Sequence, residues 1–172
     1  MGDDDVERVP TGGMEMSKVA IGGMLETPGL VLVKILGVRS GPGVAGKTLS
    51  LLGANGINVL CVVSSSDSSD RENISVAVER NDIDQALGLL QTISEDIEAE
   101  RIECVKNVGL LSIYGPHFSE RPAIAGMMFE AMAVKGIDIH AISTSVSTVS
   151  CLVDEKDVEA AKTQVCETFL VP

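Results

Sequence analysis

The sequence predicts an α+β protein made of two copies of one βαββαβ unit, with antiparallel sheets that carry their helices on one face. Three observations lead to this fold class. Two stretches of the chain repeat each other, and both follow the same order of strand-like and helix-like segments. The second stretch also ends one strand early, while an unassigned strand-like segment precedes the first. We therefore predict that the first unit is inserted into the second.

The repeat is visible when the chain is compared with itself. The stretch "PGVAG" at 42–46 returns 80 residues later as "PAIAG" at 122–126. Further on, "NISVAVERNDIDQA" at 73–86 matches "TVSCLVDEKDVEAA" at 148–161, now at an offset of 75. The offset changes between matched segments, where turns are expected and insertions are tolerated. We interpret this distribution as a duplication.

Each element of the first copy follows from a local pattern. Ile74, Val76 and Val78 alternate along the chain, which is typical of a strand with one buried face. Apolar residues recur at helical spacing after Pro42, a residue that suits the first position of a helix. The predicted elements are a strand at 30–38, a helix at 42–54, strands at 57–64 and 73–79, a helix at 82–95 and a strand at 101–107.

The second copy repeats this order but stops after its second helix. Its predicted elements are a strand at 108–115, a helix at 122–134, strands at 137–144 and 148–153, and a helix at 155–168. The segment "MSKVAIGGML" at 16–25 supplies the missing strand, which gives two ferredoxin-like units. The predicted organisation is a disordered acidic N-terminus at 1–14, a strand at 15–27 that completes the second unit, the first unit at 28–107 and the second unit at 108–172.

Composition narrows the classes of function. The formal net charge of −12 disfavours nucleic acid and anionic membrane surfaces as partners. No apolar run is long enough to cross a membrane, and the acidic start is unlike a signal peptide, so we expect a cytoplasmic protein. The spacing of the four cysteines predicts reduced thiols that serve as small core residues, and we expect no metal or cofactor. These residues are Cys61, Cys104, Cys151 and Cys166.

One motif suggests nucleotide binding. The stretch "SGPGVAGKT" at 40–48 fits the phosphate-binding pattern through Gly41, Gly46, Lys47 and Thr48. The second copy has two methionines where the first has this lysine and threonine, so the loop keeps its pattern without the phosphate ligands. A P-loop nucleotide-binding protein therefore remains a remote alternative. The start of the helix suits a single carboxylate better, because its backbone N–H groups and dipole favour negative charge.

The two copies resemble paired ACT domains, and more narrowly the regulatory region of aspartate kinase. The resemblance covers about residues 15 to 172, and its most specific stretch is "ISTSVSTVSCLVDEKDVEAA". It implies an allosteric module that binds a free amino acid, with lysine or threonine as the expected effector. It also implies a homodimer formed through the ACT sheets and a possible partner in an aspartate kinase catalytic chain. No catalytic domain or catalytic residue is expected in this chain.

The resemblance assigns the effector site residue by residue. The effector carboxylate is expected on the backbone of Gly43, Val44 and Ala45, within the loop that begins with Ser40 and Gly41. A backbone clamp is expected at the start of the second strand of each unit, and polar side chains are expected near the end of that strand in the first. The clamp residues are Asn58 and Val59 in the first unit and Asp138 and Ile139 in the second, and the polar residues are Ser64 and Ser65.

The sequence departs from the family pattern at this site. The family usually has an acid two residues before the Pro-Gly pair, where this chain has Ser40. Ser64 and Ser65 replace a Gln-Asn pair, and Val146 replaces a Glu. These departures motivate an alternative function, an effector-blind ACT dimerisation module. The second loop has Ala123 in place of Gly43, and we expect it to admit a ligand less closely.

Overall fold

The computed structural model describes residues 18–116, 118 and 123–172. The predicted disordered terminus at 1–14, the start of the strand predicted at 15–27 and Pro122 therefore lie outside the described residues. The strands are β1 (Val19–Ala20), β2 (Gly23–Arg39), β3 (Cys61–Ser66), β4 (Arg71–Glu79), β5 (Arg101–Tyr114), β6 (Ile139–Thr144), β7 (Thr148–Asp154) and β8 (Phe169–Leu170). The α-helices are α1 (Val44–Ala54), α2 (Ile83–Ile93), α3 (Ile124–Val134) and α4 (Val158–Thr168).

Six strands form one antiparallel sheet in the order β3-β4-β2-β5-β7-β6. The first part of β2, Gly23–Thr27, pairs with the last part of β5, while Leu30–Arg39 pairs with β4. Each half therefore contains four neighbouring strands in ferredoxin-like order. In the second half, one of the four is the first part of β2, which comes from before the first repeat. The predicted fold class, with the first unit inserted into the second, is confirmed.

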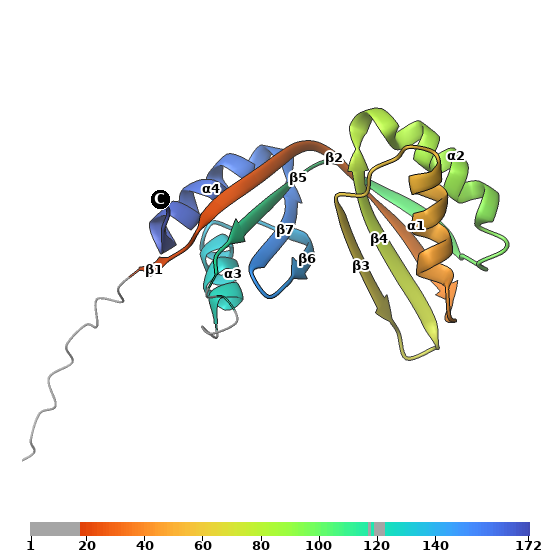
Figure 1. Cartoon of the computed structure of the whole chain (residues 1–172), viewed down its shortest axis with the longest axis horizontal. Helices are drawn as coiled ribbons and strands as arrows, with labels where there is room; N and C mark the ends of the chain where they lie inside the picture. The colour runs from red at the N-terminus through yellow and green to blue at the C-terminus, as the bar shows by residue number, and fades with distance from the viewer. Residues whose placement is uncertain (1–17, 117, 119–122) are drawn as a thin grey trace, which may run out of the picture.

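The two long strands pass from one half of the molecule to the other (Figure 1). β2 bends at Gly29, whose φ is +74°, and its pairing with β5 changes register between Thr27 and Leu30. β5 contains Asn107 with a φ of +56° at the corresponding place. The sheets of the two units are thus continuous, and no break in the chain separates 28–107 from 108–172. We keep these ranges as proposed limits of the units.

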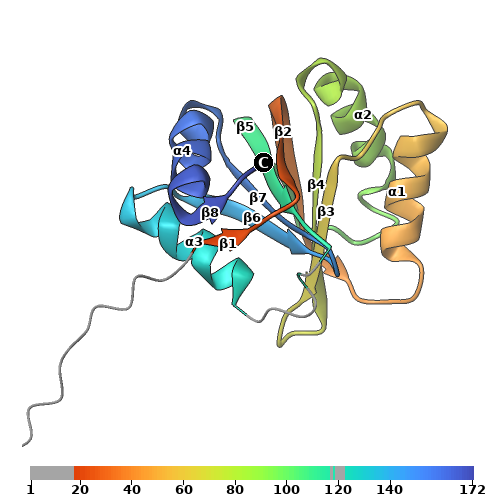
Figure 2. The ribbon, with the colours of Figure 1, turned by 60° about the vertical axis from the view of Figure 1, so that its left-hand side comes forward.

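The helices lie on the outside and the strands lie between them (Figure 2). In the first half, Val33, Ile35 and Val76 belong to a buried cluster under α1 and α2. In the second half, Met128 and Met132 of α3 belong to the matching cluster. A third cluster, with Leu30, Leu32, Ala77, Val108 and Leu152 as its buried members, lies on the helix-free face of the sheet.

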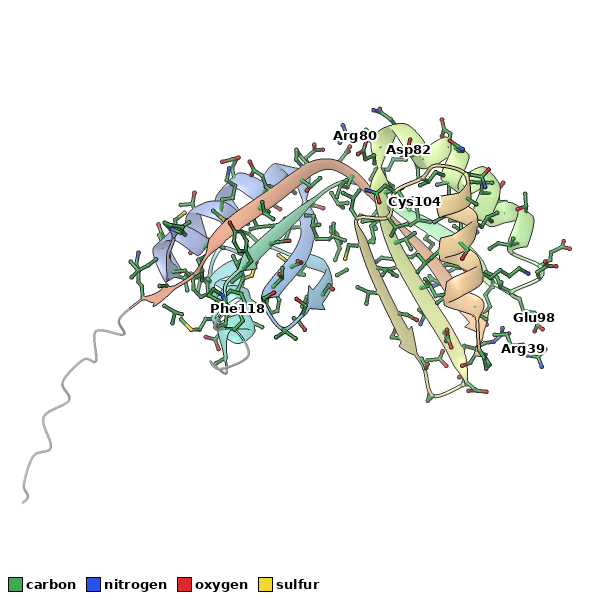
Figure 3. The ribbon with its side chains drawn as sticks, viewed as in Figure 1. Arg39, Arg80, Asp82, Glu98, Cys104 and Phe118 are labelled. Carbon is green, nitrogen blue, oxygen red and sulfur yellow. The ribbon has the colours of Figure 1, made fainter. Side chains whose placement is uncertain are left out.

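A polar contact ties the halves together beside the bend of β2. Arg80 and Glu155 stand at equivalent places in the two repeats, each at the start of a short 3₁₀ turn, and they form an ion pair. The other carboxylate oxygen of Glu155 accepts a hydrogen bond from the Gly29 backbone N–H at 3.1 Å. Figure 3 shows Arg80 where the two halves meet. This contact holds a turn of the second repeat against the crossing strand.

Several predicted limits need correction. α1 begins at Val44, so Pro42 precedes the helix instead of starting it. β3 begins at Cys61, because a turn at 55–56 follows α1 and Ile57 still donates its N–H to the Leu52 carbonyl oxygen at 3.0 Å. The N-terminal strand is interrupted at Ile21, and its short first part pairs in parallel with β8, a two-residue strand that the sequence analysis did not predict. The described α-helices each have 11 residues, and none of them is long enough to cross a membrane.

Candidate functional site

The loop between β2 and α1 presents the start of a helix to solvent. Gly43 is the residue before the helix and has a φ of +92°, a left-handed conformation that suits glycine. Its carbonyl oxygen accepts the Lys47 N–H at 2.7 Å, and the Gly41 carbonyl oxygen accepts the Val44 N–H at 3.5 Å. The N–H of Ala45 belongs to the first turn, where the helix itself supplies no acceptor. Helix starts of this kind favour negatively charged groups such as a carboxylate.

The hydroxyl group of Ser40 connects this loop to β4. Ser40 Oγ donates a hydrogen bond to Glu72 Oε1 at 3.0 Å, and the Ser40 N–H donates to the Asp70 carbonyl oxygen at 3.3 Å. Glu72 lies two residues before Ile74, which is buried beneath the helices. Successive side chains of a strand alternate between faces, so Glu72 is on the helix side of the sheet. Sequence reasoning missed Glu72, although this alternation places it on that face.

The structure brings one of the two predicted serines to the same face. Ser64 pairs with Ile74 and therefore lies on the helix side, while Ser65 pairs with Asn73 on the opposite side. Both are near the end of β3 that is level with the β2–α1 loop, because Ser66 pairs with Glu72 and Glu72 pairs with Val38. Ser64 can therefore contribute to a site at this loop from within the chain, and Ser65 points away from it.

The predicted clamp residues lie elsewhere. Asn58 and Val59 precede β3, at the end of the sheet remote from the loop, since Cys61 pairs with Ala77. Six strand residues separate the two ends, which is about 20 Å at the usual rise of about 3.3 Å per residue. Asp138 precedes β6 and Ile139 begins it, the same arrangement in the second half. Within one chain, the structure does not bring the predicted clamp residues to the β2–α1 loop.

The phosphate-binding motif does not form a nucleotide cradle. The Thr48 side chain is fully buried, and its hydroxyl donates to the Val44 carbonyl oxygen at 3.0 Å inside its own helix. The Lys47 ammonium group lies 2.9 Å from Asp96 Oδ2. The six-stranded sheet is antiparallel, whereas a P-loop connects a strand to a helix within a parallel sheet. These contacts assign Lys47 and Thr48 structural roles.

A cavity of about 230 Å³ lies at the equivalent loop of the second unit. Its described lining includes Ala123 before α3, and this residue has a φ of +79°, close to the conformation of Gly43. Thr144 and Ser145 line it from positions equivalent to Ser64 and Ser65. The remaining lining is apolar, with Phe118 among its members (Figure 3). Although we expect this loop to admit a ligand less closely, it has a cavity of its own.

The titratable groups outside these loops form no catalytic arrangement in the described part of the chain. The hydrogen bond from His140 Nε2, 2.8 Å from Asp154 Oδ1, lowers the pKa of Asp154. Burial raises the pKa of the Cys151 thiol to about 12, and such a thiol is inert at neutral pH. All four cysteines are free, and Cys61 and Cys104 are half-buried. Cys166 is exposed, so the prediction that all four serve as core residues is wrong for Cys166.

Comparisons with known proteins agree with this fold. The family model of the ACT domain matches the chain twice, at residues 33–92 and 111–169. The aspartate kinase of Stutzerimonas stutzeri is 35% identical over 127 residues, which cover 74% of this chain and 31% of that protein. The chain thus spans about a third of the length of the curated relatives that it matches.

Solved structures show the same similarity. A crystal structure of aspartokinase alpha and beta subunits has a TM-score of 0.78 and 28% identity, over 87% of this chain and 98% of that chain. The aspartate kinase of Synechocystis has a TM-score of 0.84 and 25% identity, over 90% of this chain and 28% of that protein. Because the family model matches both halves, the chain belongs to the ACT domain family and carries two copies of the domain.

Proposed function

We propose that the chain is an amino-acid-binding allosteric regulatory module of an aspartate kinase, with lysine or threonine as the effector. The observation that carries the proposal is the pair of ACT copies, whose similarity to aspartate kinases extends over about a third of those enzymes. The helix start at Gly43, Val44 and Ala45 supports it, because it offers backbone donors to the carboxylate that every free amino acid carries.

The proposal includes a homodimer formed through the edges of the ACT sheets. β3 is an edge strand, and its Val62 is 42% exposed. If two copies of β3 pair antiparallel about a two-fold axis, the start of one lies beside the end of the other. Asn58 and Val59 of one copy would then lie near the β2–α1 loop of the second copy. Two copies of the other edge strand, β6, would pair in the same way and would place Asp138 and Ile139 of one copy near the loop before α3 of the second copy.

The proposal also names a larger assembly. One similar solved structure contains aspartokinase alpha and beta subunits, and this chain covers 98% of the chain that it matches there. We propose that a catalytic chain of an aspartate kinase, in the cytoplasm, is the protein whose activity this module regulates. The catalytic chain can be separate from the module or continuous with it. In both cases the module changes the activity of the kinase when an amino acid binds.

A thermal-shift screen of the twenty amino acids, with ATP and Mg²⁺ added to the panel, tests the proposal. At about a 100-fold excess over Kd, a ligand that binds only the folded state adds about 2.7 kcal/mol to the free energy of unfolding. We expect lysine or threonine to raise the melting temperature. If neither lysine nor threonine raised the melting temperature, the effector assignment would be contradicted.

The same screen distinguishes the alternative functions. An effector-blind dimerisation module is favoured by Ser40 at the position where the family has an acid, and it would show no shift with any amino acid. A nucleotide-binding protein would instead show a shift with ATP and Mg²⁺ that is abolished by Lys47→Ala. Because Lys47 pairs with an exposed aspartate and Thr48 is buried, we expect no such shift.

A further inference from the structure

The structure places a carboxylate, that of Glu72, beside the proposed site, where the sequence analysis predicted none. An effector amino acid carries an ammonium group beside its carboxylate, and burying that charge without an acceptor is costly. The residue at position 40 is a serine and cannot supply a negative charge. Its hydroxyl group, however, holds the Glu72 carboxylate at 3.0 Å, next to the loop that leads to Gly43.

Glu72 has an uncommitted negative charge. In the described part of the chain, no arginine or lysine forms an ion pair with it. Arg71 donates to the carbonyl oxygens of Gly37 and Glu98 at 2.9 and 3.1 Å. Arg39 at the end of β2 pairs with Glu98 at 2.8 Å, and Lys47 in α1 pairs with Asp96 at 2.9 Å. Figure 3 shows Arg39 and Glu98 together at this end of the first half.

The fold also directs this carboxylate toward the site. Glu72 continues the row of Ile74, Val76 and Val78, whose side chains pack under α1 and α2. It is half-buried, so its charge is partly shielded from water, which strengthens an ionic contact. On the same face, Ser66 is the residue that pairs with Glu72 from the neighbouring strand. A carboxylate and two hydroxyl groups, those of Ser40 and Ser66, therefore flank the helix side of the sheet near the helix start.

We propose that Glu72 is a specificity-determining residue of the effector site, where its carboxylate pairs with the α-ammonium group of a free amino acid. Ser40 is its positioning residue. In this arrangement the helix start binds the α-carboxylate and Glu72 binds the α-ammonium group, so that the site selects zwitterions over simple carboxylates. The inference rests on the proposed function, and it explains how a chain without the usual acid at position 40 can still bind an amino acid.

Glu72→Gln in the full chain tests the proposal, because it removes the charge and keeps the shape. Titration calorimetry would compare the amino acid that stabilises the wild type with the analogue that lacks the α-amino group, aminocaproate for lysine or β-hydroxybutyrate for threonine. We expect the variant to bind the amino acid about tenfold to a hundredfold more weakly, the range for losing a hydrogen bond to a charged group. Its affinity for the analogue should change little.

Two further variants complete the experiment. Asp70→Asn removes one negative charge from the adjacent turn, where the left-handed backbone of Asp70 also suits asparagine, and it should leave affinity unchanged. Ser40→Ala should weaken the binding of the amino acid more than the binding of the analogue. The loss of affinity for the amino acid should be smaller than in Glu72→Gln. Equal losses for the amino acid and the analogue in Glu72→Gln, or no loss at all, would overturn the assignment of Glu72 and leave the proposed function standing. A wild type that binds no amino acid would overturn both.

Discussion

At the residue scale, the two repeats differ at the position before the first helix of each unit. Gly43 and Ala123 have φ values of +92° and +79°, so both have the left-handed backbone conformation. An L-residue with a side chain is strained in that conformation, whereas glycine is not. No atom lies within 4 Å of a Cβ built on Gly43, so a substitution there would meet no steric clash. Both copies keep the left-handed turn, but only the first copy has glycine, the residue that suits it best.

Exchanging these residues should change stability in opposite directions. Gly43→Ala is expected to lower the free energy of unfolding by about 1 kcal/mol, because the left-handed cost exceeds the gain from restricting the unfolded chain. Ala123→Gly is expected to raise it by about 0.5 to 1 kcal/mol for the same reason. Urea unfolding of both variants beside the wild type measures the two changes. Changes of the same sign would contradict the left-handed conformation at one of the two positions.

At the element scale, the packing of α4 on the sheet depends on a missing side chain. Gly109 lies in β5 opposite Val153, and a Cβ built on it would be 2.5 Å from Val158 Cγ2. Val158 is the first residue of α4 and is buried. The helix can therefore approach β5 this closely only because residue 109 is glycine.

Gly109→Ala should lower the free energy of unfolding by about 1 to 3 kcal/mol, the usual cost of overpacking a core. Val158→Ala removes the methyl groups that would clash, at the cost of a small cavity. The double variant should then be more stable than the sum of the single changes indicates, since the two residues are in contact. Chemical denaturation of all four proteins gives this coupling. Additive changes would show that the cost of Gly109→Ala does not come from a clash with Val158.

At the scale of the whole molecule, the two ACT units share their sheet. β2 contributes to both halves, as does β5, and Arg80 of one repeat is paired with Glu155 of the other. The helix-free cluster around Leu32, Val108 and Leu152 adds apolar contacts that neither half can bury alone. Because neither β2 nor β5 can leave one half without disturbing the other, the chain should unfold as one unit.

A cavity made in one half should therefore destabilise both. Met128→Ala in α3 is expected to lower the free energy of unfolding by about 2 to 5 kcal/mol, because Met128 is fully buried. Hydrogen exchange at the Val33 and Ile35 amides, in the other half, should accelerate by the factor that corresponds to this loss of free energy. The reason is that central strands exchange through global unfolding. Val134→Ala on the same helix is the control, because Val134 is 79% exposed. Unchanged protection at Val33 in Met128→Ala would mean that the halves unfold independently.

Much of the fold was predictable because its signals are local. The alternation of Ile74, Val76 and Val78 marks β4, and the repeated Gly-rich turn marks the helix that follows each leading strand. The limits were less predictable. "GINV" at 56–59 has the composition of a strand, but Ile57 donates its N–H to the Leu52 carbonyl oxygen to close the helix, so the strand starts later. Hydrogen bonds to a preceding element prevail there over intrinsic preference.

The candidate site was predictable only in part, for the same reason. Gly43, Val44 and Ala45 are adjacent in the chain, and their pattern is sufficient to indicate an anion-binding helix start. The contact between Ser40 and Glu72 joins residues that are 32 positions apart, and it exists because Glu72 pairs with Val38 across β2 and β4. Strand register of this kind has no signature within either segment.

The sequence by itself determined that the chain is a duplicated βαββαβ unit with an N-terminal strand that belongs to the second copy, because hydrophobic periodicity and internal similarity are properties of the chain read in order. Only the tertiary structure decided that β2 and β5 run unbroken through both units, that Asn58 and Val59 lie at the far end of the sheet, and that Glu72 stands beside Ser40. These features depend on pairing between distant strands, and that pairing is selected by the packing of the whole core.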